Sequence, residues 1–387
     1  MIGFIILFLV GIILFVLLNR IYLYFRDNTS INPNLLIILF AFIFFGGFVI
    51  SILSFFVNSI DICRILSKIS YYWLGLMLYM ALGLLISLIT RFVFKKILKE
   101  KYKLNKAQRY TFIFVIIFTL LMNTYGIYNG HNIHITKYQL ITDKSLDNLH
   151  IAFISDLHLG YNVGLSEVDD MVNKLNELNP DIVLIGGDIF DNEYLAIEKP
   201  EEMIKLFNNI HSKYGVYTCL GNHDVEENIF LGFTFHGKNS IISDEMLNFL
   251  NKCNIKLLYE DYVCLDNYII YGRPDYERVN LQNNSIKSID DALEDIDNTK
   301  YLIVLDHEPR FMDEYANNGV DVLLNGHTHN GQIWPGTLTI KLFWDNSYGY
   351  KKYNQMDNIV SSGIGLYGVN MRIGSFAEIC DIYVNGN

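Results

Sequence analysis

The chain has 387 residues and a formal net charge of −11, and 51% of its residues are hydrophobic. The charge is divided unevenly, because residues 1–130 hold 12 Lys and Arg against 3 Asp and Glu, whereas the remainder holds 18 against 38. Nucleic-acid-binding proteins usually present a basic face to the phosphate backbone. The acidic remainder therefore argues against nucleic acid as a partner.

The first 130 residues contain four apolar stretches without charged side chains, near residues 2–19, 35–57, 71–90 and 110–128. Each is about long enough to cross a bilayer core, which takes roughly 20 residues. A soluble helical bundle is the alternative, but it would need polar outer faces that these stretches lack. A cleaved signal peptide is not expected, since no basic residue precedes the first stretch and no small-residue cleavage pattern follows it. We predict an all-α, four-helix transmembrane region over residues 1–130.

Loop charges predict the orientation of this region. The segment 91–109 holds eight basic residues against one acidic residue, so the positive-inside rule places it in the cytoplasm. In a four-span count the loop near residues 20–27 falls on the same side, and the mildly basic loop near residue 64 falls outside. We therefore expect a multi-pass protein of the cytoplasmic membrane, with a second domain, residues 131–387, outside the cytoplasm.

Five short apolar runs follow in the second domain. They are residues 151–154, 182–185, 216–220, 302–305 and 322–324. Runs that are apolar throughout, rather than alternating, are typical of strands buried on both faces of a sheet. Amphipathic stretches such as 167–178 and 200–210 lie between them. Alternating strands and helices predict an α/β fold class.

Polar groups lie directly beyond these runs. They are Asp156 with His158, Asp188 with Asp191, Asn222 with His223 and Asp224, His307, and His327 with His329. Open α/β sheets place their sites at the carboxyl ends of their strands. Each motif alone is common, but oxygen ligands and imidazoles in this order and context suit two adjacent divalent ions that activate water against a phosphate ester.

The motif series resembles the calcineurin-like metallophosphoesterase superfamily. Segments 155–160 and 326–335 are similar to its membrane-anchored bacterial branch, and the resemblance covers about residues 147–385. It implies an α-β-β-α sandwich of two mixed sheets. In that branch a Pro commonly precedes the Glu found here as Glu378, whereas this chain has Ala377.

The resemblance also implies a set of metal ligands. It assigns Asp156, His158, Asp188 and His329 to the first ion, and Asp188, Asn222, His307 and His327 to the second. Asp188 would bridge the ions, because the two oxygens of a carboxylate can bind two cations. His236 is the alternative to His307, but no strand precedes it. The expected ions are manganese, iron or zinc.

The residue types present in the sequence also predict the mechanism. The sequence has no G-x-S-x-G elbow, and its cysteines lack a partner His at a recognisable spacing, so a protein nucleophile has little support. We expect a metal-activated hydroxide to attack phosphorus, and His223 to protonate the leaving oxygen or stabilise its charge. Asp224 could orient His223 or serve as a turn or cap residue. Asp191 is expected beside the ligands or in a turn rather than as a direct ligand.

The expected activity is hydrolysis of a phosphodiester or pyrophosphate bond, in an envelope or lipid substrate, by a membrane-anchored enzyme. The alternative enzyme is a UDP-2,3-diacylglucosamine-type hydrolase of lipid A biosynthesis, whose cytoplasmic substrate disagrees with the expected orientation. A non-catalytic membrane receptor or scaffold is the alternative of another class, and the complete ligand set argues against it. Cys253 and Cys264 flank an expected hairpin and could pair in an oxidising compartment.

Overall fold

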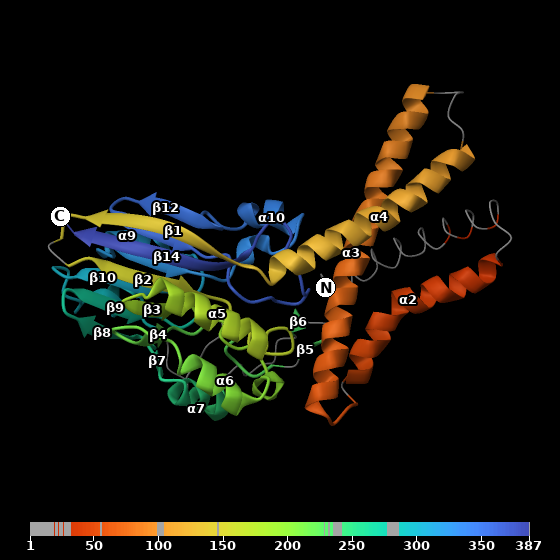
Figure 1. Cartoon of the computed structure of the whole chain (residues 1–387). Coiled ribbons are helices and arrows are strands. Elements are labelled where there is room, and N and C mark those ends of the chain that lie inside the picture. Colours follow the sequence, from red (N-terminus) through yellow and green to blue (C-terminus); the bar gives the residue numbers. More distant parts are fainter. Residues whose placement is uncertain are drawn as a thin grey trace. The chain divides into compact units, whose positions relative to one another are not determined.

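The computed structural model describes residues 32–386 with gaps at 55, 99–103, 145–146, 228, 231–232, 235–241 and 277–285, together with residues 19, 22 and 26 (Figure 1). It divides into two compact units, Met1–Ile127 and Tyr128–Asn387. The boundary lies three residues before the one predicted from the change in composition.

The first unit is helical where it is described. Its helices are α2 (Pro33–Ser54), α3 (Ile60–Leu98) and α4 (Leu104–Gly130), the last of which continues into the second unit. The segments Ile60–Ile97 and Ile113–Gly130 are long and apolar enough to cross a membrane. Large apolar side chains such as Phe42 and Leu121 are exposed, as expected of helices that face lipid. Two of the four predicted spans are thus supported by length and composition, and residues 2–18 of the first predicted span lie outside the described residues.

Helix α3 differs from the prediction in length. It has 39 residues, or about 58 Å at 1.5 Å per residue, roughly twice the thickness of a bilayer core. Its first turns include Arg64 and its last turn includes Lys95 and Lys96, so the segments predicted as loops near residue 64 and from residue 91 are helical there. Hydropathy marks where an apolar stretch ends. It does not mark where a helix ends, because Lys and Arg are good helix formers.

The second unit contains two six-stranded mixed sheets. The first has the order β1 (Ile133–Thr142), β14 (Ala377–Gly386), β2 (Leu149–Ile154), β3 (Ile182–Ile185), β4 (Val216–Thr218), β7 (Ile255–Leu257). The second has the order β12 (Gly349–Tyr353), β13 (Met356–Val360), β11 (Val322–Asn325), β10 (Tyr301–Leu305), β9 (Tyr268–Gly272), β8 (Asp261–Leu265). A short pair, β5 (Ile229–Phe230) and β6 (Phe233–Thr234), lies apart from them. All five predicted strands are confirmed, and so is the α/β class.

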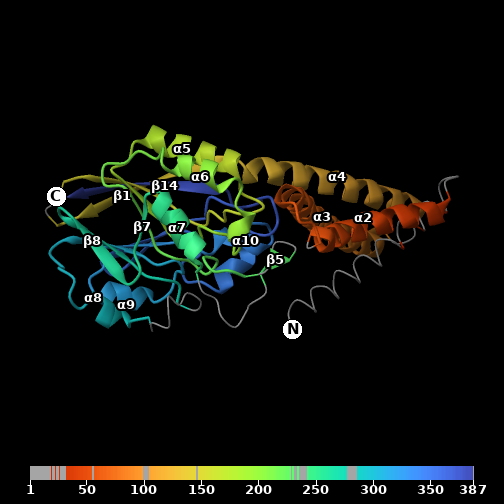
Figure 2. The same ribbon diagram turned by 90° about the horizontal axis from the view of Figure 1, so that it is seen from below.

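Side chains alternate between the two faces of each strand, which produces three cores. In β2, Phe153 packs between the sheets with Ile303 of β10, whereas Ile154 faces the outer core. The outer core of the first sheet is covered by α5 (Leu165–Leu178), α6 (Pro200–Phe207) and α7 (Asp244–Lys252), and that of the second by α8 (Ile289–Leu293) and α9 (Met312–Asn317). Figure 2 shows α5 and α6 on one outer side and α8 and α9 on the other. The predicted sandwich of two mixed sheets is confirmed.

Strand direction decides which end of the sandwich carries the predicted ligands. Strands β2, β3 and β4 are parallel neighbours, so their carboxyl ends meet at one edge. Strand β14 is antiparallel to β2 and parallel to β1. Strand β1, which follows α4 directly, therefore begins at the edge where β2, β3 and β4 end.

The cysteine pair considered from the sequence is not formed. Cys253 is buried at the end of α7, Cys264 is exposed on β8, and both are free thiols. The two side chains lie in different environments, so residue spacing alone was misleading.

Candidate metal centre

Five of the seven predicted ligands have a strained backbone conformation. Asp156, His158, Asp188, His327 and His329 all have positive φ, between 48° and 68°. Residues other than glycine rarely adopt this conformation, and each instance costs on the order of 1–3 kcal/mol. Five such residues in the loops after β2, β3 and β11 indicate that these turns are kept for the side chains they present.

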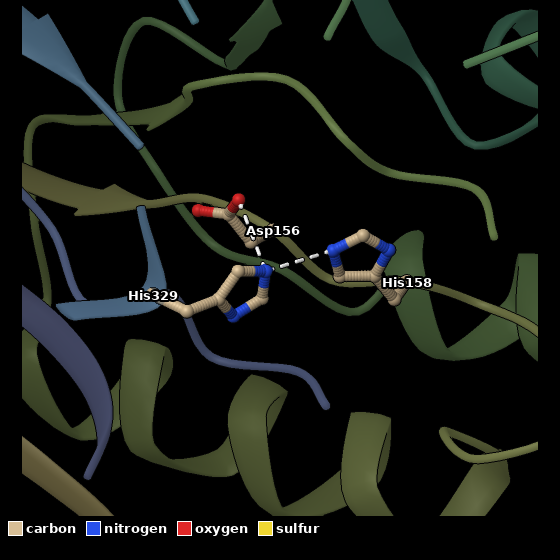
Figure 3. Close-up of side chains that lie close together, drawn as sticks. All are labelled: Asp156, His158 and His329. Carbon is tan, nitrogen blue, oxygen red and sulfur yellow. Dashed lines mark hydrogen bonds and ion pairs between the residues drawn. The ribbon is translucent and has the colours of Figure 1, made fainter. Parts of the chain in front are cut away.

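A first group of ligand-type atoms is formed by Asp156, His158 and His329, which converge in Figure 3. Nε2 of His329 lies 3.0 Å from Nε2 of His158 and 3.4 Å from Oδ1 of Asp156. Burial, followed by the neighbouring His158, holds the pKa of His329 well below its ordinary value. A neutral imidazole has a free lone pair, which is the form that binds a cation.

A second group joins Asp156 and Asp188 through His307, and all three side chains are buried. Nδ1 of His307 lies 2.7 Å from the carbonyl oxygen of Gly186, so this nitrogen carries the hydrogen. Nε2 lies 3.0 Å from Oδ2 of Asp188, yet it makes no hydrogen bond with any residue that the structure describes. A buried nitrogen between two carboxylates without a hydrogen bond is the arrangement expected of a metal ligand.

Electrostatics agrees with this interpretation. Burial alone would lower the pKa of His307, but the carboxylates of Asp188 and Asp156 raise it well above its ordinary value. Burial would raise the pKa of Asp188, but His307 and His223 hold it well below its usual range. The carboxylates thus favour positive charge beside them, carried either by a proton on Nε2 of His307 or by a divalent cation that displaces this proton. Buried charges are stable only when they are paired or bind a metal, so the residues present fit a divalent cation.

Asn222 and His327 complete the cluster. Nδ1 of His327 lies 2.8 Å from Oδ1 of Asn222, and the ring of His327 is perpendicular to that of His307 at 5.2 Å. The backbone N–H of His327 donates to Asp156. The structure therefore brings all seven predicted ligands together in one continuous set of contacts. The alternative, His236, lies outside the described residues.

His223 lies beside the cluster, and Asp224 takes the turn role that was one of its two predicted alternatives. The ring of His223 is 5.0 Å from that of His158, but its Nδ1 contacts Oδ1 of Asn192. Asp224 instead accepts hydrogen bonds from three backbone N–H groups, those of Asp188, Phe190 and Gly221, at 2.7–2.9 Å. Asp224 thus holds two ligand loops together through their backbone N–H groups, as a turn residue does. Asn192, rather than Asp224, contacts and orients the ring of His223.

Asp191 lies beside a predicted ligand. Its Oδ1 is 3.7 Å from Nδ1 of His158, and neither carboxylate oxygen has a hydrogen-bond partner among the described residues. Burial raises the pKa of this carboxyl, and His158 opposes the shift. The position suits a group that fixes the orientation of His158.

No role was predicted for Arg372, although its side chain is fully buried beside the cluster. Its Nη2 lies 3.3 Å from Nδ1 of His329, and its guanidinium donates to the carbonyl oxygens of Ser362, Gly363 and Gly365. Burial lowers the pKa of Arg372 to about 10. A single Arg in an apolar segment was the available signal, but a sequence does not show burial. Nothing in the sequence distinguished Asn192 from an ordinary turn residue, since Asn is common in turns.

The close approach of two ligand loops makes Gly221 a sensitive position. A Cβ at residue 221 would lie 2.3 Å from Oδ1 of Asp188 and 2.5 Å from its backbone nitrogen. We therefore expect Gly221→Ala to displace Asp188 and reduce the metal bound per chain, measured by elemental analysis of the full chain after dialysis against manganese.

Gly319→Ala is the matched control for this change. Residue 319 has φ +76° but no atom near a new Cβ, so the change should cost about 1 kcal/mol in stability and leave bound metal unchanged. Equal metal content in both variants would show that the loops around Asp188 do not hold the ion.

Comparison with known proteins agrees with the motifs and the geometry. Residues 149–331 match the family model described as calcineurin-like phosphoesterase. An uncharacterized metallophosphoesterase of Helicobacter pylori is 33% identical over 239 residues, which are 61% of this chain and 60% of that protein. A Danio rerio transmembrane protein with metallophosphoesterase domain is 28% identical over 337 residues, 80% of this chain and 74% of that protein.

A solved structure, the NAD nucleotidase of Haemophilus influenzae, is 16% identical and covers 57% of this chain and 45% of that one, with a TM-score of 0.36. The chain spans about 60% of the length of the Helicobacter protein. The resemblance seen in the sequence is confirmed by the family model and the relatives: residues 149–331 carry a calcineurin-like phosphoesterase domain.

Proposed function

We propose that this protein is a membrane-anchored phosphoesterase that uses two divalent metal ions. The observation that carries the proposal is the arrangement around His307, whose Nε2 faces Asp188 at 3.0 Å without a hydrogen bond. Residues 1–130 would be the anchor and residues 131–387 the catalytic domain. Manganese, iron and zinc are all compatible with a set of carboxylate, amide and imidazole ligands.

Each proposed ion has four protein ligands. Asp156, His158, Asp188 and His329 would hold the first, and Asp188, Asn222, His307 and His327 the second. Bound there, the ions would supply an activated water and neutralise charge that develops on the phosphoryl oxygens. The protein's own contribution is to fix these ligands in loops clamped by Asp224, whose carboxylate binds the backbone of Asp188 and Gly221.

His223 is the proposed general acid. Its Nδ1 contacts the amide oxygen of Asn192, which only accepts, so Nδ1 carries a hydrogen and Nε2 is the atom that exchanges a proton. The Tyr367 ring lies 4.6 Å from His223 and 5.4 Å from His158, and forms a wall beside both. A protonated His223 would deliver its Nε2 proton to the leaving oxygen.

The proposed substrate is a phosphodiester or pyrophosphate of a lipid or envelope component. The candidate membrane spans support this choice, and so does the transmembrane description of the Danio rerio relative. A UDP-2,3-diacylglucosamine-type hydrolase remains the alternative, and the side of the membrane that the domain faces decides between them. The complete ligand cluster disfavours a non-catalytic receptor or scaffold.

The bridging role of Asp188 can be tested with the full chain purified in detergent. Asp188→Asn should lower bound metal from about two ions per chain and nearly abolish hydrolysis of aryl phosphate mono- and diesters, because the bridge supplies charge to both sites. Asp297→Asn, the same change at an exposed position, should alter neither quantity. Two ions retained at a normal rate in Asp188→Asn would remove the assignment.

The role of His223 can be separated from metal binding. His223→Asn should leave metal content near normal and slow the reaction by about 10²- to 10⁴-fold, the range for loss of a general acid. A nitrophenyl leaving group should be affected less than an alkyl leaving group, since it needs little protonation. His211→Asn, at an exposed histidine, is the control. An equal loss with both leaving groups would leave His223 only a role in charge stabilisation.

Sidedness distinguishes the two substrate proposals. The basic segment 91–109 precedes the apolar part of α4, Ile113–Gly130, so the domain after α4 should lie on the outer side. Protease added to intact spheroplasts should cut within residues 131–387 and spare the basic segment. Protection of the domain until the cells are lysed would reverse this orientation and favour the cytoplasmic UDP-lipid hydrolase.

A further inference from the structure

One surface segment of the phosphoesterase domain is apolar and exposed. Residues 334–344, here called the apolar segment, include α10 (Gly336–Thr339) and η4 (Ile340–Leu342). Leu338, Leu342 and Phe343 are 59%, 81% and 77% exposed. Leu338 and Leu342 lie four residues apart along consecutive helical turns, so they share one side. Clusters of large exposed apolar side chains mark interaction surfaces rather than ordinary protein surface.

The charge of this segment differs from that of the domain around it. Residues 330–344 contain one charged side chain, Lys341, whereas acidic residues outnumber basic ones about two to one in residues 131–387. Trp, Phe and Leu with a neighbouring Lys are typical of segments that lie in the membrane interface, where the apolar groups enter the bilayer and the ammonium reaches the head groups.

Hydrogen bonds tie this segment to the end of α4. Nδ2 of Asn129 donates to the carbonyl oxygens of Arg372 and Ser375, at 3.1 and 2.7 Å. The backbone N–H of Trp334 donates to the carbonyl oxygen of Ile373, at 2.7 Å. Residues 372–375 are thus held on one side by the last turn of a candidate membrane span, which ends at Gly130, and on the other by the apolar segment.

The same segment borders the metal cluster. It begins five residues after His329, and it ends at Trp344, whose ring lies 5.1 Å from that of His327. In Figure 1, α10 lies at the end of the sandwich where β1 begins. That is also the edge at which β2, β3 and β4 present their ligands. The exit from the span, the apolar segment and the ligands therefore share one end of the domain.

We propose that the apolar segment docks on the lipid bilayer and holds the metal cluster at the membrane surface, so that the site takes phosphate esters carried by lipid head groups. The occupant is the bilayer rather than a second copy of the chain, because the candidate span ends at Gly130 and the adjacent Asn129 is bonded to residues 372–375, which contact this segment. Apolar contact is needed there, since an acidic domain is repelled by anionic lipid. The docking proposal depends only on these contacts. The choice of substrate depends in addition on the proposed phosphoesterase activity.

Docking can be measured without catalysis. The full chain carrying Trp73→Phe retains Trp334 and Trp344 as its only tryptophans. In vesicles of phosphatidylcholine and phosphatidylglycerol brominated near the head-group end of the acyl chain, tryptophan emission should be quenched, and Asp188→Asn should not change this. Leu342→Ser with Phe343→Ser should relieve the quenching. Ile141→Ser, at an equally exposed position near the far end of β1, should not.

The catalytic consequence is measured in the same vesicles. The double variant should lower kcat/KM about tenfold or more for a phosphodiester on a bilayer lipid, because interfacial binding scales with buried apolar area, and leave a water-soluble aryl phosphodiester unaffected. Equal effects on both substrates, or none on either, would overturn the substrate assignment. A wild-type chain inactive on both would refute the proposed function, and the quenching would still decide the docking.

Two results would overturn the docking itself. One is tryptophan emission that brominated lipid does not quench in the Trp73→Phe chain with the apolar segment intact. The other is a chain that is not quenched and that forms dimers in detergent, if the double variant is a monomer there. Mass photometry measures both oligomeric states. The second result would assign the apolar segment to contact between copies of the chain.

Discussion

Two buried carboxylates at neighbouring strand ends, Asp156 and Asp188, set the constraint on which the rest of the domain depends. Both side chains are fully buried or nearly so, and the imidazole of His307 lies beside them without a hydrogen bond at Nε2. Like charges in a dry site repel each other and lose hydration, so this arrangement needs positive charge between the groups. A divalent cation would supply that charge, and the strained turns and the backbone hydrogen bonds of Asp224 hold the ligand residues in place for it.

The direction of the strands links this chemistry to the end of α4, a candidate membrane span. Because β14 is antiparallel to β2 and parallel to β1, the chain enters the domain at the edge where the ligand loops leave it. A reversed β1 would have placed the entry at the opposite end of the sandwich. The buried Arg372 joins the two features, since its backbone carbonyl is bonded by Asn129 and its guanidinium lies beside His329.

The ligand cluster could be predicted because each motif follows an apolar strand, and parallel strands bring their carboxyl ends together whatever lies between them. The supporting groups could not be predicted in the same way. Asp224 is adjacent to His223 in sequence, but the turn aims its carboxylate at backbone N–H groups and leaves Asn192 to contact the ring. The length of helix α3 could not be predicted for a similar reason. Hydropathy identifies only the apolar part of a helix, whereas the helix continues through charged residues of high helix propensity.

The central claim is that the cluster around Asp188 binds two metal ions, and anomalous X-ray scattering from the manganese-loaded full chain tests it most directly. We predict two anomalous peaks about 3.5–4 Å apart, the usual spacing of dinuclear sites, with the Asp188 carboxylate between them. His307 and His327 should contact one peak, and His158 and His329 the other. A single peak, or peaks away from these side chains, would contradict the account.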